Sequence, residues 1–84
     1  MYELRSSDHV DDQVTHLPRE VLVGFAEVRA VLEVAPWSGE SIHDASPHAP
    51  VRSWAFGPDG RGVVYYLIQE RLRLVDLLDV LWTG

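Results

Sequence analysis

Residues 51–67, VRSWAFGPDGRGVVYYL, contain two apolar runs joined by a short glycine-rich segment. The runs over residues 51–56 and 62–69 are rich in β-branched and aromatic residues, which favour strands. Between them, the Pro-Asp-Gly sequence at 58–60 has the residue types of a tight turn, with the glycine suited to a left-handed backbone conformation. The stretch therefore predicts an antiparallel hairpin.

The glycines of this segment do not indicate a nucleotide-binding loop. Such a loop needs a preceding strand, a longer glycine segment that ends in Gly-Lys-Ser or Gly-Lys-Thr, and a helix whose amides face the phosphates. The sequence contains no lysine, and the segment leads into a second apolar run of strand character. Turn geometry is therefore a sufficient reason for the glycines.

A short strand and two helices are predicted before the hairpin. Residues 2–5 alternate between apolar and polar types, as in a strand, and the capping residues at 6–8 predict a helix over residues 8–16. A second helix is predicted from residue 18 to about residue 34, because its apolar side chains recur at spacings of four, three and four. These side chains are Val21, Phe25, Val28 and Leu32.

The segment after the hairpin, residues 71–82, supports two interpretations by periodicity. A helical spacing joins Leu74, Leu77, Leu78 and Leu81, whereas one face of a strand would hold Leu72, Leu74, Leu78, Val80 and Trp82. The preceding hairpin favours a third strand that completes a meander. The predicted order is β-α-α-β-β-β, an α+β fold in which a helical hairpin packs on an antiparallel meander sheet.

The segment between the second helix and the hairpin, residues 35–50, is rich in Pro, Ser and His and has no periodicity. It is predicted to cross the surface as a connector, with Trp37 anchoring it to the body of the protein. His43 and His48 have side chains suited to acid–base chemistry near neutral pH, or to half of a metal site. The simpler interpretation is that they are surface imidazoles of a loop.

The composition limits the classes of function. A chain of 84 residues supports a single domain over 1–84 with one modest core. The absence of cysteine excludes disulfides and thiolate metal sites, and no metal or cofactor site is predicted. Short apolar runs and the lack of a signal-peptide pattern at the N-terminus predict a cytoplasmic protein with no membrane partner.

The charge of the protein is distributed unevenly. The formal net charge is −6, and residues 1–50 account for all of it, because residues 51–84 carry four acidic and four basic side chains. Every basic residue is arginine. The four in the C-terminal part are Arg52, Arg61, Arg71 and Arg73, whose guanidinium groups are suited to bidentate phosphate contacts.

The element order, over nearly the whole chain, resembles the RelE/ParE superfamily of bacterial toxin–antitoxin toxins. The most specific part is PVRSWAF at 50–56, followed by GRGVVYY at 60–66. The superfamily has an Arg that enters the first meander strand and a second Arg at the start of the next, before an apolar run with Tyr. Arg52 and Arg61 match these positions, and we expect them to face each other across the hairpin.

The resemblance implies a protein that arrests growth, either as a ribosome-dependent mRNA endoribonuclease that inhibits translation or as an inhibitor of DNA gyrase. It implies a cognate antitoxin as partner and, for a nuclease, ribosome-bound mRNA as substrate. In the nucleases, cationic side chains on the open face of the sheet hold the RNA backbone. The expected catalytic residues are Arg52 and Arg61, and the expected RNA-binding residues are Arg52, Arg61, Arg71, Arg73 and Tyr65.

Other functions remain open at this point. Members of the superfamily often have catalytic lysines and a basic tail, whereas this chain has no lysine and reaches Gly84 where that tail would begin. Its acidic charge is also unsuited to the salt-dependent hold that phosphate contacts give. The alternative is a non-catalytic RelE/ParE-fold protein that acts by protein binding, as a gyrase-type inhibitor or a degenerate toxin. A third possibility is a regulatory domain that forms homodimers, with its arginines as solvated charges that protect sheet edges.

Overall fold

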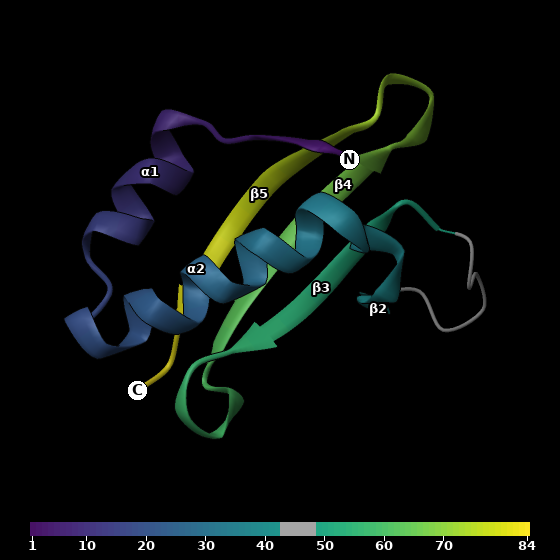
Figure 1. Ribbon diagram of the computed structural model, residues 1–84. Helices are drawn as coiled ribbons and strands as arrows, with labels where there is room; N and C mark the ends of the chain where they lie inside the picture. The colour runs from purple at the N-terminus through teal and green to yellow at the C-terminus, as the bar shows by residue number, and fades with distance from the viewer. Residues whose placement is uncertain (43–48) are drawn as a thin grey trace.

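The computed structural model describes residues 1–42 and 49–84 (Figure 1). Two helices and five strands follow in the order β1 (Glu3–Arg5), α1 (Asp8–Thr15), α2 (Arg19–Val34), β2 (Glu40–Ser41), β3 (Val51–Phe56), β4 (Gly62–Gln69) and β5 (Leu74–Trp82). Short 3₁₀ turns lie between them: η1 (Pro36–Ser38), η2 (Pro58–Gly60) and η3 (Glu70–Leu72). The predicted α+β fold, with its helical pair and its β3–β4–β5 meander, is confirmed.

The sheet is larger than the sequence predicted. Its strand order is β1-β5-β4-β3-β2, and the meander pairs are antiparallel. The first strand joins the outer edge of β5 in parallel, with Glu3 opposite Leu74, so the sheet is mixed and not wholly antiparallel. The two-residue strand β2 pairs with β3 inside the segment that was expected to have no regular structure. Two residues are too few to produce a detectable period.

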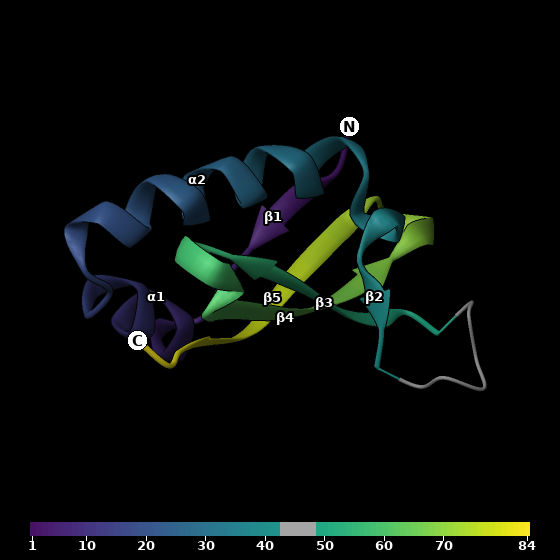
Figure 2. The same cartoon turned by 90° about the horizontal axis from the view of Figure 1, so that it is seen from below.

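Helix α2 covers one face of the sheet, and no helix lies over the opposite face in the described part of the chain (Figure 2). The predicted apolar face of α2 is buried, with Leu32 fully inaccessible to solvent. It packs against alternate residues of β4, of which Val64 and Tyr66 are also fully buried. Figure 2 shows that the other face, called the open face below, is left for solvent or a partner.

A β-bulge explains why the last segment has an ambiguous period. Tyr66 lies opposite Leu77 while Tyr65 lies opposite Asp79, so Leu78 is an extra residue that has no partner of its own in the ladder. The bulge reverses the alternation, and the buried residues are Val75, Leu77 and Val80. The predicted strand is confirmed, but the predicted inward face through Leu72 and Leu78 is wrong, because both side chains are exposed.

Helix α1 protects the edge of β5 beyond the end of β1. The helix starts at the Ser7 side chain, which accepts a hydrogen bond from the amide of Val10. The Gln13 side chain then takes the place of a neighbouring strand: its Oε1 accepts from the amide of Val80 at 2.8 Å, and its Nε2 donates to Asp79 Oδ1 at 2.6 Å. An edge closed in this way is not available for pairing with another chain. Neither α1 nor α2, nor any other helix within residues 1–42 and 49–84, is long and apolar enough to cross a bilayer.

The buried side chain of Tyr66 holds the turn that follows α2 in position. The phenolic hydroxyl of this buried residue donates to the carbonyl of Pro36 at 2.6 Å, and burial raises the pKa of Tyr66 to about 12. Gly39 lies against the same hydroxyl, and a Cβ atom placed there would overlap it and would also lie 2.9 Å from the carbonyl of Ser53. Glycine is therefore required at this position by space and not by backbone conformation.

We expect Gly39→Ala to lower the free energy of unfolding by about 1–3 kcal/mol, the usual cost of overpacking a well-filled site. The added methyl group would push the Tyr66 hydroxyl away from Pro36. Urea denaturation measures the effect, and Ser38→Ala, at an exposed neighbouring position, is the matched control. Equal stability of the two variants would contradict the tight contact.

Candidate functional site

Arg52 lies on the core side of β3, where only 8% of its surface is exposed. Its Nη1 donates to the carbonyls of Gly39 at 2.8 Å and Trp37 at 3.2 Å, and its Nε donates to the carbonyl of Ala49 at 3.3 Å. The guanidinium carbon is 5.0 Å from the centroid of the Trp37 ring. The guanidinium group therefore binds both ends of the connector to the sheet.

Arg61 does not lie opposite Arg52. The hairpin register places Tyr66 opposite Arg52, whereas Arg61 is outside the ladder, directly after the turn η2. The exposed guanidinium group of Arg61 has a weak ion pair with Asp59 at 3.8 Å, and its main-chain carbonyl accepts from Thr83. The expected pairing of the two arginines across the hairpin is wrong. The pair of the β3–β4 ladder nearest the turn is Phe56 with Gly62, so Arg61 lies in the turn and outside the ladder.

Arg71 and Arg73 lie at the opposite end of β4 from Arg61 (Figure 1). The strand spans eight residues, so about 25 Å separates its two ends. Arg71 is exposed on η3, and Arg73 adopts a left-handed conformation with φ 54° at the start of β5. The four arginines that were expected to hold RNA are therefore not gathered into one patch.

Arg73 belongs to a cluster around the carboxylate of Glu70. Oε1 of Glu70 accepts from the Tyr2 hydroxyl at 2.5 Å and from Trp37 Nε1 at 2.8 Å, while Oε2 accepts from Arg73 Nη1 at 2.7 Å. The guanidinium carbon of Arg73 also lies 4.0 Å from the centroid of the Tyr2 ring. These hydrogen bonds, with that of Tyr2 the strongest influence, lower the pKa of Glu70 to about 2. The expected anchoring role of Trp37 is confirmed by its contacts with Glu70 and Arg52.

Tyr65, one of the expected RNA-binding residues, lies on the open face, whereas the adjacent Tyr66 is buried on the other side of β4. Strand alternation and register place on this face Glu3, Arg5, Glu40, Val51, Ser53, Ala55, Val63, Tyr65, Leu67, Gln69, Leu74, Asp76, Asp79 and Leu81. Four of these residues are acidic, and Arg5 is the one basic residue among them. Its Nε donates to Asp76 Oδ1 at 3.0 Å, which lowers the pKa of that carboxyl group. The open face is thus acidic and apolar.

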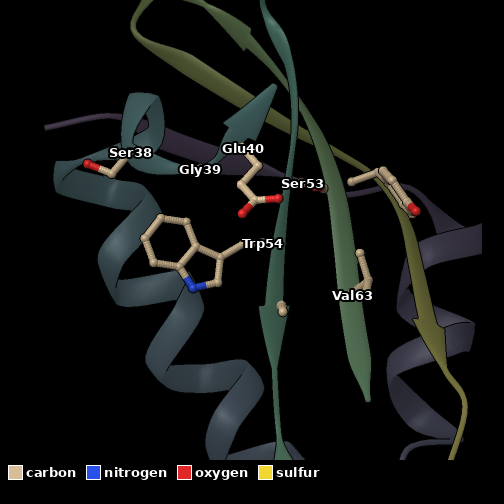
Figure 3. Close-up of a pocket in the computed structure, with 8 residues that line it drawn as sticks. Ser38, Gly39, Glu40, Ser53, Trp54 and Val63 are labelled. Atoms are coloured by element: carbon tan, nitrogen blue, oxygen red, sulfur yellow. The ribbon is translucent and has the colours of Figure 1, made fainter. Parts of the chain in front are cut away.

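A hollow lies where the open face meets the edge beyond β2 (Figure 3). It is lined by Ser38, Gly39, Glu40, Ser53, Trp54, Ala55, Val63 and Tyr65. Glu40 lies opposite Ser53 and belongs to the open face, whereas Trp54 lies opposite the buried Val64 and its indole packs against the core on the α2 side of β3. Sequence reasoning missed Glu40, because the strand that positions it is only two residues long.

The hollow offers one carboxylate, hydroxyl groups and an aromatic surface, which suit a cationic or hydrogen-bond-donating group. His43 and His48 lie outside the described residues. Within residues 1–42 and 49–84, no three His, Asp or Glu side chains are grouped as a metal site would require.

Arg52→Met is expected to lower the free energy of unfolding by about 2–3 kcal/mol, because hydrogen bonds from a charged donor to buried carbonyls are lost. Arg61→Met, at an exposed arginine, is the matched control and is expected to change it by less than about 0.5 kcal/mol. Urea denaturation of both variants measures the difference. An equally stable Arg52→Met protein would contradict the structural role of this guanidinium group.

The Glu70 cluster predicts a dependence of stability on pH. The folded state lowers the pKa of Glu70 from 4.5 to about 2, so its contribution is complete above pH 4.5 and is lost as the pH falls towards 2. Glu70→Gln should therefore be less stable than the wild type at neutral pH, and this difference should shrink through that window. Urea midpoints measured across it test this. The lowered pKa values of Asp76 and Asp79 affect both proteins alike, and a difference that does not change with pH would contradict the prediction.

No protein-family model matches the chain, and no curated protein matches it in sequence. Solved structures do match. A chain of the E. coli RelBE toxin–antitoxin complex superposes with a TM-score of 0.79 at 10% identity, covering 100% of this chain and 99% of that one. The isolated E. coli RelE toxin gives 0.81 at 9% identity, covering 100% and 86%. The archaeal RelE–RelB complex of Pyrococcus horikoshii gives 0.68 at 18% identity, covering 99% and 96%. The chain therefore has the RelE-like toxin fold.

Proposed function

We propose that this chain is the toxin component of a toxin–antitoxin system, a protein that arrests growth until a cognate antitoxin binds it. The observation that carries the proposal is the match over the whole chain to RelE structures, two of which are complexes of a toxin with its antitoxin. The uncovered face of the sheet supports it as well, because it leaves a large surface on which a partner can bind. The proposed place of action is the cytoplasm.

The charges favour a toxin that acts by protein binding over one that cleaves RNA. Holding an RNA backbone requires cations that neutralise phosphates. The guanidinium group of Arg52 is engaged by carbonyls, Arg73 binds Glu70, and Arg5 on the open face binds Asp76. The same face carries four carboxylates against one arginine, and this excess of negative charge would repel RNA. A gyrase-type inhibitor or a degenerate toxin fits this surface better.

RNA cleavage at the ribosome is the second candidate function, and the exposed Arg61 and the hydroxyl of Tyr65 are the observations that favour it. In such a reaction, the 2′-oxygen attacks the neighbouring phosphorus and loses its proton. The bond from phosphorus to the 5′-oxygen breaks, and that oxygen takes up a proton. Arg61 would stabilise the charge on the phosphate, and Tyr65 would supply or orient a proton. Arg52 would act only through the position of β3.

Growth measurements test the proposed function. Induced expression of the chain alone in a bacterial host is expected to lower viable counts, and coexpression of the small protein encoded by the neighbouring gene is expected to restore them. Full viability without that second protein would contradict the toxin function. A catalytically inactive variant is not needed for this first test.

Primer extension on cellular mRNA then separates the two mechanisms. Protein binding predicts growth arrest without new mRNA ends, and Arg61→Ala with Tyr65→Phe should leave the arrest unchanged. RNA cleavage predicts new ends within codons, which the same double variant abolishes. Arg19→Ala, at an exposed arginine where α2 begins, is the matched control, and circular dichroism verifies that each variant folds.

A further inference from the structure

Helix α1 is attached to the rest of the protein by few of its side chains. Val10 is the one buried residue of this helix, Gln13 and Val14 are partly buried, and the other five residues are exposed. The helix packs against β5 and comes close to α2 at few points. Eight residues are too few for a helix that persists in isolation. The helical state of α1 therefore depends on its contact with β5.

The contact of α1 with the main chain of β5 is made by a single side chain. The edge of β5 pairs with β1 only at residues 74–76. Beyond them, Gln13 Oε1 accepts from the amide of Val80 at 2.8 Å, and Gln13 Nε2 donates to Asp79 Oδ1 at 2.6 Å. The Nε2 atom of His9 lies 3.3 Å from the same carboxylate oxygen. No other hydrogen bond within residues 1–42 and 49–84 joins α1 to the main chain of β5.

Both ends of α1 adjoin short connecting segments. Ser6 and Ser7 connect it to β1, and both are exposed. A hollow lies at this end of the helix. It is lined by Arg5, Ser6, Ser7, Asp76, Leu77 and Leu78. At the other end, the amide of Val21 donates to the carbonyl of Pro18, so α2 begins without a hydrogen bond from α1.

We propose that α1 is a latch over the edge of β5, which opens as a unit while α2 and the sheet remain folded. In the closed state, the amide of Val80 is bound by Gln13. In the open state, residues 6–16 form an exposed loop, and the main-chain groups at the edge of β5 over residues 77–80 are exposed to solvent. Exposed strand edges pair with other chains, so Gln13 acts as a built-in inhibitor of such pairing. The latch goes beyond the toxin function and does not rest on it.

The neighbouring elements α2 and β1 are held by more contacts than α1. Helix α2 buries four apolar side chains against the sheet. Strand β1 pairs with β5, and the adjacent Tyr2 is buried. The amide of Tyr2 donates to the carbonyl of Glu33 at 2.7 Å, and its hydroxyl donates to Glu70. Local opening costs least where buried apolar contacts are fewest, so of these three elements α1 opens most readily.

Cysteine labelling measures the opening, because the chain has no native cysteine. The thiol of Val10→Cys lies on the buried side of α1 and reacts with DTNB only when α1 leaves β5. The thiol of Val64→Cys, buried on a central strand, is the matched control. The first thiol is expected to react at least about tenfold faster than the second, with little dependence on urea below the unfolding transition. Equal rates with the same steep dependence on urea would mean that α1 opens only on global unfolding, and would overturn the proposal.

The substitution Gln13→Ala tests the side chain that closes the edge. Added to Val10→Cys, it is expected to raise the labelling rate about tenfold, as the loss of one or two hydrogen bonds would. Alanine favours a helix more than glutamine does, so a weaker helix could not explain the faster rate. Asp12→Ala, at an exposed position of α1, is the matched control: it also raises helix propensity but removes no contact with β5, so the rate should stay equal or fall. Equal labelling rates of the two variants would overturn the role of Gln13.

Hydrogen exchange followed by nuclear magnetic resonance reports on the edge itself. The amide of Val80 should exchange through the same opening, with the weak urea dependence of the Val10→Cys labelling, whereas the amide of Leu32 in α2 should require global unfolding. Protection of Val80 equal to that of Leu32 would overturn the latch.

The latch and the proposed function fail in different measurements. Labelling and exchange are measured on the purified full chain, and circular dichroism verifies that each variant folds. A chain that arrests growth but opens α1 only on global unfolding keeps the toxin function and refutes the latch. A chain that opens α1 locally but has no effect on viability keeps the latch and refutes the toxin function.

Discussion

The carbonyl groups of Pro36, Trp37 and Gly39 need hydrogen-bond donors where the chain leaves α2, and the sheet supplies them. Tyr66 serves the first carbonyl, and Arg52 serves the other two. A buried carbonyl without a donor costs free energy comparable to a lost hydrogen bond, so these donors determine the path of the chain. This path brings β2 beside β3 and thereby forms the wall of the hollow that contains Glu40.

Arginines of this protein fill structural positions that a sequence pattern cannot distinguish from functional ones. Arg52 binds carbonyls, and Arg73 binds a carboxylate and stacks on Tyr2. The guanidinium group suits both tasks because it has several donors in a rigid plane and keeps its charge when partly buried. The RelE-like fold is thus compatible with a face that is acidic, and a shared fold does not fix the chemistry of its surface.

The sequence was sufficient to predict the elements that have a clear hydrophobic periodicity or a characteristic turn sequence. The helix with Val21, Phe25, Val28 and Leu32 on one side and the hairpin around residues 58–60 were predicted correctly. The site was harder to predict because its parts come from long-range pairings. Glu40 is positioned by two ladder pairs, and the Glu70 cluster joins side chains 33 and 68 residues apart in the sequence. Neither the position of Glu40 nor the Glu70 cluster produces a local pattern in the sequence.

The extra residue at Leu78 has a consequence for how this chain compares with its structural neighbours. The alternation of inward and outward side chains is reversed after the bulge. A sequence without the bulge can therefore be aligned with all of β5 only if a gap is placed inside the strand. The fold requires buried apolar volume at Val75, Leu77 and Val80, and several residue types supply that volume equally well. Two chains can therefore share a fold at very low sequence identity, as the TM-score of 0.81 at 9% identity illustrates.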